Sequence, residues 1–130
     1  MDAEMPNNLL QRMHDLYSAE HPLSSLAESV FVRPGMFTMN GTWEEAGAFL
    51  EGFYSGMISH NREAYAQTEA QQWFDFCAWA TPQVDGEATG GCRSLFRALR
   101  RKHAQDIAAF YEILLLYRAF CELNPIPERE

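Results

Sequence analysis

The chain has 130 residues, enough for one domain whose core needs neither disulfides nor metals for stability. Hydrophobic residues make up 47% and aromatic residues 13%, which excludes a disordered chain. Only the ends, residues 1–7 and 124–130, are expected to be frayed. No run of 18 apolar residues predicts a membrane span, and the acidic N-terminus is unlike a signal peptide, so we expect a cytoplasmic protein.

The formal net charge of −8 is unevenly distributed along the chain. Residues 1–92 hold thirteen acids against three arginines, whereas residues 93–103 hold four arginines, one lysine and no acid. The last 27 residues return to a balance of −3. Such a field repels nucleic acid overall and steers a basic protein toward the acidic part, although acidity also simply keeps a protein soluble.

The first half of the chain begins with apolar residues at helical spacing over residues 8–19. Residues 23–32 are read as a short helix that leads into an extended segment. Arg33 precedes Pro34, which disfavours the helical region, and Pro34-Gly35 is a strong turn signal. Whether a short hairpin forms across this turn, over residues 29–39, is left open.

The clearest helix begins after Thr42, because Thr42 and Glu45 match a capping box. Apolar residues then recur at three- and four-residue steps and predict one buried stripe: Trp43, Ala46, Leu50, Phe53 and Met57. Ala48, Gly52 and Gly56 form a second line. Each helical glycine costs about 1 kcal/mol relative to alanine, so we expect another segment to pack closely there.

Two or three helices are predicted in the second half. One runs over residues 62–80 and ends at Thr81-Pro82, with Cys77 in its apolar stripe. The segment "TPQVDGEATGG" is a loop that carries Asp85 and Glu87. Residues 92–123 form one helix or two, with a candidate break near Lys102 and His103. Together these patterns predict a mainly α protein: a single compact helical domain, residues 1–130, of about four to six helices.

No group of residues has the spacing of a catalytic or metal site. The four histidines are scattered, and none lies at a ligand spacing from another histidine or a cysteine. Three cysteines are an odd number for a disulfide framework. Cys77 reads as a core residue, and Cys92 as an inert exposed thiol without a base beside it. We therefore predict no catalytic residue, no metal and no cofactor, and expect that the protein is not an enzyme.

The basic stretch allows two interpretations. Arg93, Arg97 and Arg100 or Arg101 recur on one helical face, as in a helix that contacts phosphates. The sequence pI of 4.9 is far from the basic value of such proteins. We favour the second interpretation, a cation-rich face that balances nearby acids, and we expect no nucleic acid partner.

A longer pattern begins at Arg33. "RPGMF", a short gap and "AFLEGF" are similar to R-P-G-M-Y, a gap and L-x-x-F-L-x-G-Y, with Phe37 and Phe53 in place of the tyrosines. Residues 108–117, "AAFYEILLLY", are similar to a second aromatic helix of the same chains. This pattern resembles small bacterial proteins, several of which resemble immunity proteins of polymorphic and contact-dependent growth inhibition toxin systems.

The resemblance implies an immunity protein that neutralises a cognate toxin domain by tight stoichiometric binding. Because nuclease toxins are commonly basic, an acidic inhibitor would be steered toward such a toxin. The residues predicted to contact the toxin are Arg33, Trp43, Glu44, Glu45, Glu51, Asp85 and Glu87. Trp43 is also a candidate for the core.

Two alternatives remain open. The chain could be another intracellular helical interaction module, such as an adaptor, a chaperone or a regulator, and could form a homodimer. It could also be a small enzyme whose site is assembled from residues that are distant in sequence.

Overall fold

The computed structural model describes residues 25–60, 64–86 and 91–123, and their regular structure is entirely helical. The predicted mainly α fold is thus confirmed for these residues. No helix among these residues is long and apolar enough to cross a membrane. The elements are α2 (Leu26–Val32), the short 3-10 helix η2 (Pro34–Met36), α3 (Trp43–His60), α4 (Ala64–Val84), α5 (Cys92–Lys102) and α6 (Asp106–Leu123). The predicted helix over residues 8–19, the frayed ends and Glu87 lie outside the described residues.

The hairpin considered for residues 29–39 is absent, because α2 and η2 occupy that segment. The Ser25 side chain caps α2 by accepting a hydrogen bond from the Glu28 amide at 3.3 Å. Phe31 is fully buried and contacts the rings of Trp73 and Tyr117, 6.1 Å away. Packing of this kind favours a helix here over one arm of a hairpin.

The capping box of α3 is confirmed. Thr42 Oγ1 accepts from the Glu45 amide at 3.1 Å, and Glu45 Oε1 accepts from the Thr42 amide at 3.4 Å. Met57 of the predicted stripe is only half-buried, and one position is exchanged, because Tyr54 is fully buried while Phe53 is 41% exposed. Both residues continue the helical spacing from Leu50, so only the position of the neighbouring helices decides between them.

The end of α4 was predicted at Thr81-Pro82, but the helix continues to Val84. Thr81 Oγ1 donates to the Cys77 carbonyl at 2.6 Å, and the Asp85 amide donates to the Thr81 carbonyl at 2.9 Å. Pro82 removes one backbone donor, toward Ala78. Pro82 and Ala78 are both exposed, so water can replace the missing bond. A proline this close to the helix end is therefore tolerated.

Residues 92–123 form two helices, which decides between the two alternatives left open, and α5 ends at the candidate break near Lys102 and His103. The His103 amide still donates to the Leu99 carbonyl at 2.9 Å, which closes the last turn of α5. Arg100 then donates to the carbonyls of His103 and Ala104, at 3.2 and 2.8 Å. These bonds satisfy carbonyl groups that the helix end leaves without an amide partner.

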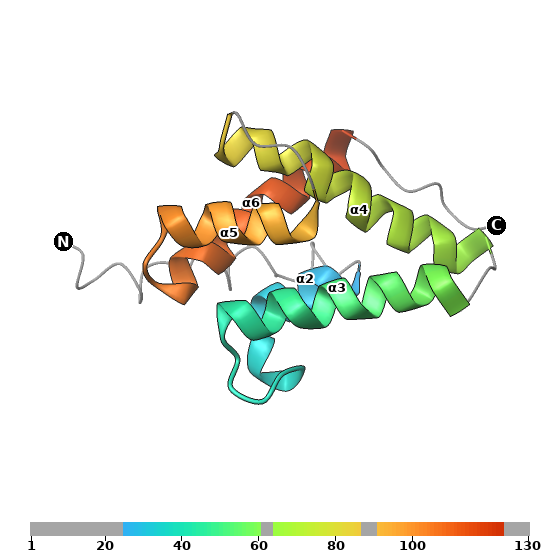
Figure 1. Ribbon diagram of the computed structural model, residues 1–130, viewed down its shortest axis with the longest axis horizontal. Coiled ribbons are helices and arrows are strands. Elements are labelled where there is room, and N and C mark those ends of the chain that lie inside the picture. Colours follow the sequence, from blue (N-terminus) through green and yellow to red (C-terminus); the bar gives the residue numbers. More distant parts are fainter. Residues whose placement is uncertain (1–24, 61–63, 87–90, 124–130) are drawn as a thin grey trace.

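The helices pack against one another (Figure 1), and the core between them is rich in aromatic residues. α4 packs against both α3 and α5, α3 contacts α5 directly, and α2 packs on α6. Trp73 of α4 is fully buried at the centre and contacts several rings from other elements, those of Phe31, Tyr54, Phe96 and Tyr117. This shared core fixes α3 and α5 beside each other, and the candidate site lies between them.

Candidate functional site

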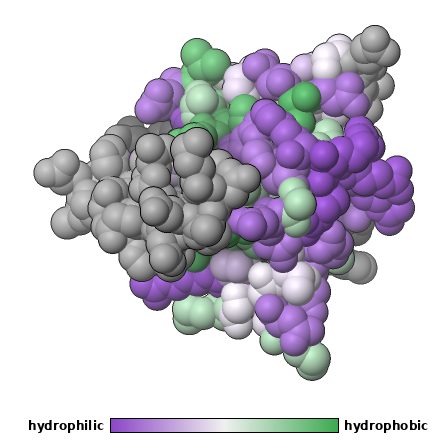
Figure 2. All heavy atoms as spheres, turned by 90° about the vertical axis from the view of Figure 1, so that its left-hand side faces the viewer, coloured by the Kyte–Doolittle hydropathy of each residue, from purple (hydrophilic) through white to green (hydrophobic). Residues whose placement is uncertain are grey.

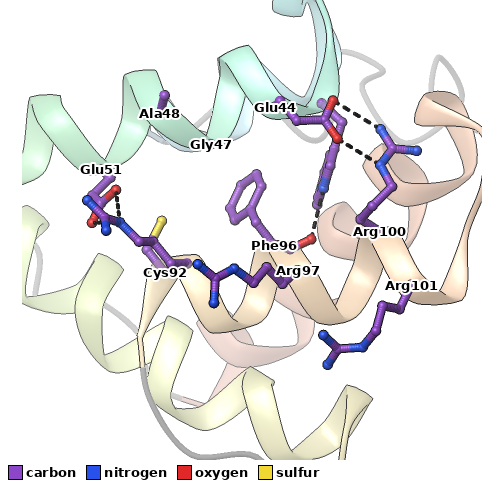
Figure 3. A pocket seen from close by; sticks show the side chains of 11 residues that line it. Glu44, Gly47, Ala48, Glu51, Cys92, Phe96, Arg97, Arg100 and Arg101 are labelled. Atoms are coloured by element: carbon purple, nitrogen blue, oxygen red, sulfur yellow. Dashed lines mark hydrogen bonds and ion pairs between the residues drawn. The ribbon is translucent and has the colours of Figure 1, made fainter.

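A groove of about 470 Å³ lies between α3 and α5 (Figure 3). One wall comes from the first half of α3 and the other from α5. The groove is lined by Trp43, Glu44, Gly47, Ala48, Glu51, Cys92, Arg93, Phe96, Arg97, Arg100 and Arg101. Sequence reasoning named three of these as partner-binding residues, but it did not predict that they share a cavity with the arginines.

The floor of the groove depends on Gly47. A Cβ atom at this position would lie 2.7 Å from Phe96 Cδ2, closer than atoms in real structures approach. The Phe96 ring therefore fills the space that a larger residue of α3 would occupy. Trp43 stacks on Phe96 at 4.3 Å, and its Nε1 donates to the Phe96 carbonyl at 3.0 Å. The two helices are thus locked together under the groove.

Trp43 was predicted either as a toxin contact or as a core residue, and the structure places it in the core. Its side chain is 1% exposed. The close approach predicted at Gly52 and Gly56 is wrong, because a Cβ at either residue would meet no atom within 4 Å. Gly47 is the glycine that permits close packing. Its contact partner, Phe96, is 49 positions away in the sequence, so helical spacing could not identify it.

Ion pairs form the rim of the groove. Glu44 accepts from Arg100 Nε at 2.8 Å, and both oxygens of Glu51 accept from Arg93 Nε at 3.0 Å. Arg100 also pairs with Asp106, which accepts from the Trp43 amide at 3.0 Å. This carboxylate therefore joins the first turns of α3 and α6 to the last turn of α5.

Three of the predicted contact acids are thus paired with the basic helix. Glu44 and Glu51 bind Arg100 and Arg93, and Asp85 accepts from Arg101 at 3.0 Å. The interpretation of residues 93–103 as a cation-rich face that balances nearby acids is confirmed by these bonds. The pairs are exposed on at least one side, so each contributes about 0–1 kcal/mol and can open when a partner competes.

Arg97 differs from its neighbours on α5. It is exposed, lines the groove, and forms no ion pair within the described ranges. Its side chain extends along α5 toward the end at which Cys92 begins the helix (Figure 3), the direction in which helical side chains lean. The repeat of arginines at steps of four and three was the signal in the sequence. Which of them lacked an acid partner could not be read from it.

A second region of interest is the projection, residues 33–42, which extends from the helices beside the N-terminal end of α3 (Figure 1). Thr38 Oγ1 donates to the Pro34 carbonyl at 3.0 Å and accepts from the Gly41 amide at 2.9 Å. The Glu45 carboxylate accepts from the amide and side chain of Asn40, at 2.8 and 3.1 Å. The Asn40 bonds lower the pKa of Glu45. This predicted contact residue therefore stabilises the projection.

Gly41 is essential to the shape of the projection. Its φ of +70° lies in the left-handed region, which favours glycine. A Cβ here would also lie 3.2 Å from the Gly35 backbone. The projection is therefore tightly folded on itself.

The tip of the projection is apolar and exposed. Met36 is 70% exposed and Met39 is 91% exposed, and Arg33 at the start of the projection is exposed without an ion pair in the part of the chain described. Figure 2 shows pale green, weakly apolar surface at the lower edge of its face, the level at which the projection lies in Figure 1. Phe37 continues this surface toward α3, where its ring contacts Phe49 at 6.1 Å.

The structure also shows where two of the cysteines and His103 lie. Cys92 is buried, so the prediction of an exposed thiol is wrong, whereas Cys77 is fully buried as predicted. Burial raises the pKa of the Cys77 thiol, which makes it a poor nucleophile. His103 is hydrogen-bonded to Glu112 at 2.5 Å. Within the described residues, no cluster of three potential ligands could hold a metal ion.

Comparison with known proteins gives no family: no family model, curated protein or solved structure matches the chain. The functional conclusion therefore depends on the two regions described above.

Proposed function

We propose that the protein is an immunity protein that neutralises a toxin domain by stoichiometric binding, and that the projection is its principal contact. The observation that carries this proposal is the exposure of Met36 and Met39 on a tightly hydrogen-bonded turn. Neither side chain contributes to the buried core. An ordered segment that exposes two large apolar side chains is typical of a binding surface.

The shape of the projection favours tight binding. Most binding energy in a protein interface comes from a few side chains that enter pockets on the partner. A segment that is ordered before binding loses less conformational entropy when the complex forms. Met39 would enter an apolar pocket, and Arg33 would pair with a carboxylate beside that pocket.

The charge of the chain supports a basic, nuclease-type toxin. Ten acids and seven Lys or Arg residues in the described ranges give −3, so the remaining residues carry −5 of the total of −8. Such a field acts at long range and raises the rate of association with a basic protein. In this proposal the field steers the toxin, and the projection supplies the short-range contact.

The test compares the wild type with Met39→Ser in an affinity capture from native bacterial lysate at low salt. We expect the wild type to retain one stoichiometric partner with a basic domain, and Met39→Ser to retain much less. Leu123→Ser is the matched control, because Leu123 is also exposed but lies at the end of α6. The captured domain is then expressed in sensitive cells with and without the protein.

Growth arrest by the captured domain, relieved by the wild type but not by Met39→Ser, would support the proposal. A captured domain that leaves growth unchanged would overturn the immunity function. If Met39→Ser and Leu123→Ser reduce capture equally, the projection is not the contact surface.

A second candidate, a helical interaction module that forms a homodimer, is favoured by a different observation. Gly52 is exposed on α3 with open space above it, and Phe53 beside it is 41% exposed. Glycine on a helix surface lets a second helix approach closely, as it does within bundles. Light scattering over a hundredfold range of concentration decides this point, since a constant monomer mass excludes the homodimer.

A further inference from the structure

The residues that line the groove are basic inside an acidic protein. Its lining contains four arginines and two glutamates, a formal charge of +2, whereas the whole chain carries −8. Every other arginine of the lining binds an acid in the described ranges: Arg93 binds Glu51, Arg101 binds Asp85, and Arg100 binds both Glu44 and Asp106. The acids that bind the lining therefore equal its arginines in number, but Arg100 takes two of them. Arg97 is left without an acid partner in the described ranges, and its exposed guanidinium group is open to a ligand.

We propose that this groove binds a small phosphate-bearing anion, with Arg97 as its central contact. This assignment is independent of the proposed toxin binding. The planar guanidinium group offers a fork of donors that fits phosphate oxygens in pairs. Arg93, Arg97 and Arg101 follow one another at four-residue steps on α5, so their positions lie about 6 Å apart along the helix. A ligand with several phosphate oxygens can contact Arg97 and one neighbour together.

The walls of the groove also accommodate an apolar part of the ligand. Gly47 and Ala48 leave the α3 wall without large side chains, and the edge of Phe96 lies on the floor. The volume of about 470 Å³ falls within the range of about 300–1,000 Å³ that is typical of small-molecule sites. The arrangement suits a nucleotide, which has charged phosphates at one end and, at the other, a planar base whose faces can pack on apolar walls.

Length and charge argue against a nucleic acid strand. The Glu44–Arg100 and Glu51–Arg93 pairs flank the groove, and their glutamates are seven residues apart on α3. Seven residues of helix span about 10 Å, which is enough for one nucleotide but short for a strand. A strand would also have to pass these carboxylates, which repel phosphates.

The first experiment is calorimetric titration of the intact protein with ATP and with inorganic tripolyphosphate at low salt. Arg97→Ala should weaken binding of the preferred probe about tenfold, because it removes a charge-assisted contact at the centre of the site. Lys102→Ala is the matched control: it removes the same charge from α5 outside the groove lining. Circular dichroism verifies that both variants are folded.

Tighter binding of ATP than of tripolyphosphate would show that the apolar walls contact the base of the nucleotide. Equal affinities would assign the site to the phosphate groups alone. The absence of saturable binding of either probe, or equal weakening by Arg97→Ala and Lys102→Ala, would overturn the proposal. So would a ten-nucleotide single strand that binds more tightly than ATP.

A second variant tests the role of the rim through a gain of affinity. Glu51→Gln removes the carboxylate that holds Arg93 and repels phosphate, so probe binding should strengthen about threefold to tenfold. Asp75→Asn makes the same charge change on α4, where Asp75 is hydrogen-bonded to Gln71 away from the groove. If both variants gain the same affinity for the probe, the effect comes from net charge alone, and the assignment of the anion site to the groove is overturned.

Discussion

The groove and the projection meet at the N-terminal end of α3, yet they place their aromatic, apolar and charged residues differently. In the groove, Trp43 is 1% exposed and most charges are paired. In the projection, Met39 is 91% exposed and Arg33 lacks an ion pair within the described ranges. The residues under the groove stabilise the fold, whereas those at the tip of the projection are exposed and contribute little to its stability. Stability and binding can therefore be separated by mutation.

The largest effect on stability is expected under the groove. Trp43→Ala removes the stack on Phe96, the bond to its carbonyl and a contact with Phe110 at 5.0 Å. Large-to-small changes of this kind cost about 3–5 kcal/mol in free energy of unfolding. Urea denaturation measures the loss. A loss below about 1 kcal/mol would show that Trp43 is not the packing element described here.

Two glycines of α3 should respond with opposite signs. Gly47→Ala places a methyl group 2.7 Å from Phe96, which is held by Trp43 and cannot easily move, so we expect destabilisation by about 1–3 kcal/mol. Gly52→Ala meets open space and should stabilise the helix by about 0.5–1 kcal/mol. Thermal melts of both variants measure the difference. Equal signs would contradict the assignment of close packing to Gly47.

The projection has its own glycine pair. Gly41→Ala forces a side chain into the left-handed region and should destabilise the protein by about 1–2 kcal/mol. Gly35→Ala is the control, because a Cβ there meets no atom within 4 Å. Thermal melts measure both, and capture of the partner follows for each. A folded Gly41→Ala variant that binds normally would show that the turn need not be ordered before binding.

The bonds of Glu112 with Lys102 and His103 predict that the stability of the protein depends on pH in the acidic range. Burial opposes ionisation of Glu112, but hydrogen bonds from Lys102 and His103 lower its pKa below the ordinary value of 4.5. A lowered pKa in the folded state stabilises the protein above the unfolded value, and this stability is lost as pH falls through the folded pKa. Glu112→Gln should therefore flatten the stability profile below pH 4.5. An unchanged slope would contradict the ionic role of Glu112.

The smallest effect on stability is expected at the tip of the projection. Met39→Ser should change the free energy of unfolding by less than about 0.5 kcal/mol, because the side chain has almost no contacts to lose. Denaturant melts measure this value in the same preparation that is used for capture. A larger loss would mean that Met39 stabilises the fold, and reduced capture by this variant would no longer identify a contact.

Local sequence determined the helical character of this protein and several of its boundaries. The capping box of Thr42 and Glu45 involves residues three apart, so it can be recognised without knowledge of the rest of the fold. The core position of Cys77 also follows from helical spacing, whereas the sequence left open whether residues 92–123 form one helix or two. The exposure of Met36 and Met39 at the tip of the projection could not be predicted from the sequence, because apolar residues such as these also fit a buried core.

Only the tertiary structure decided which residues face one another. Glu44 and Arg100 are 56 positions apart, and Gly47 and Phe96 are 49 apart, so no local pattern could pair them. The same limit explains why Phe53 was placed in the core instead of Tyr54, and why a hairpin over residues 29–39 was left open although residues 29–32 are helical. The period of a helix is fixed by its geometry, but the helices packed against it determine which of its faces is buried and which of its charges are neutralised.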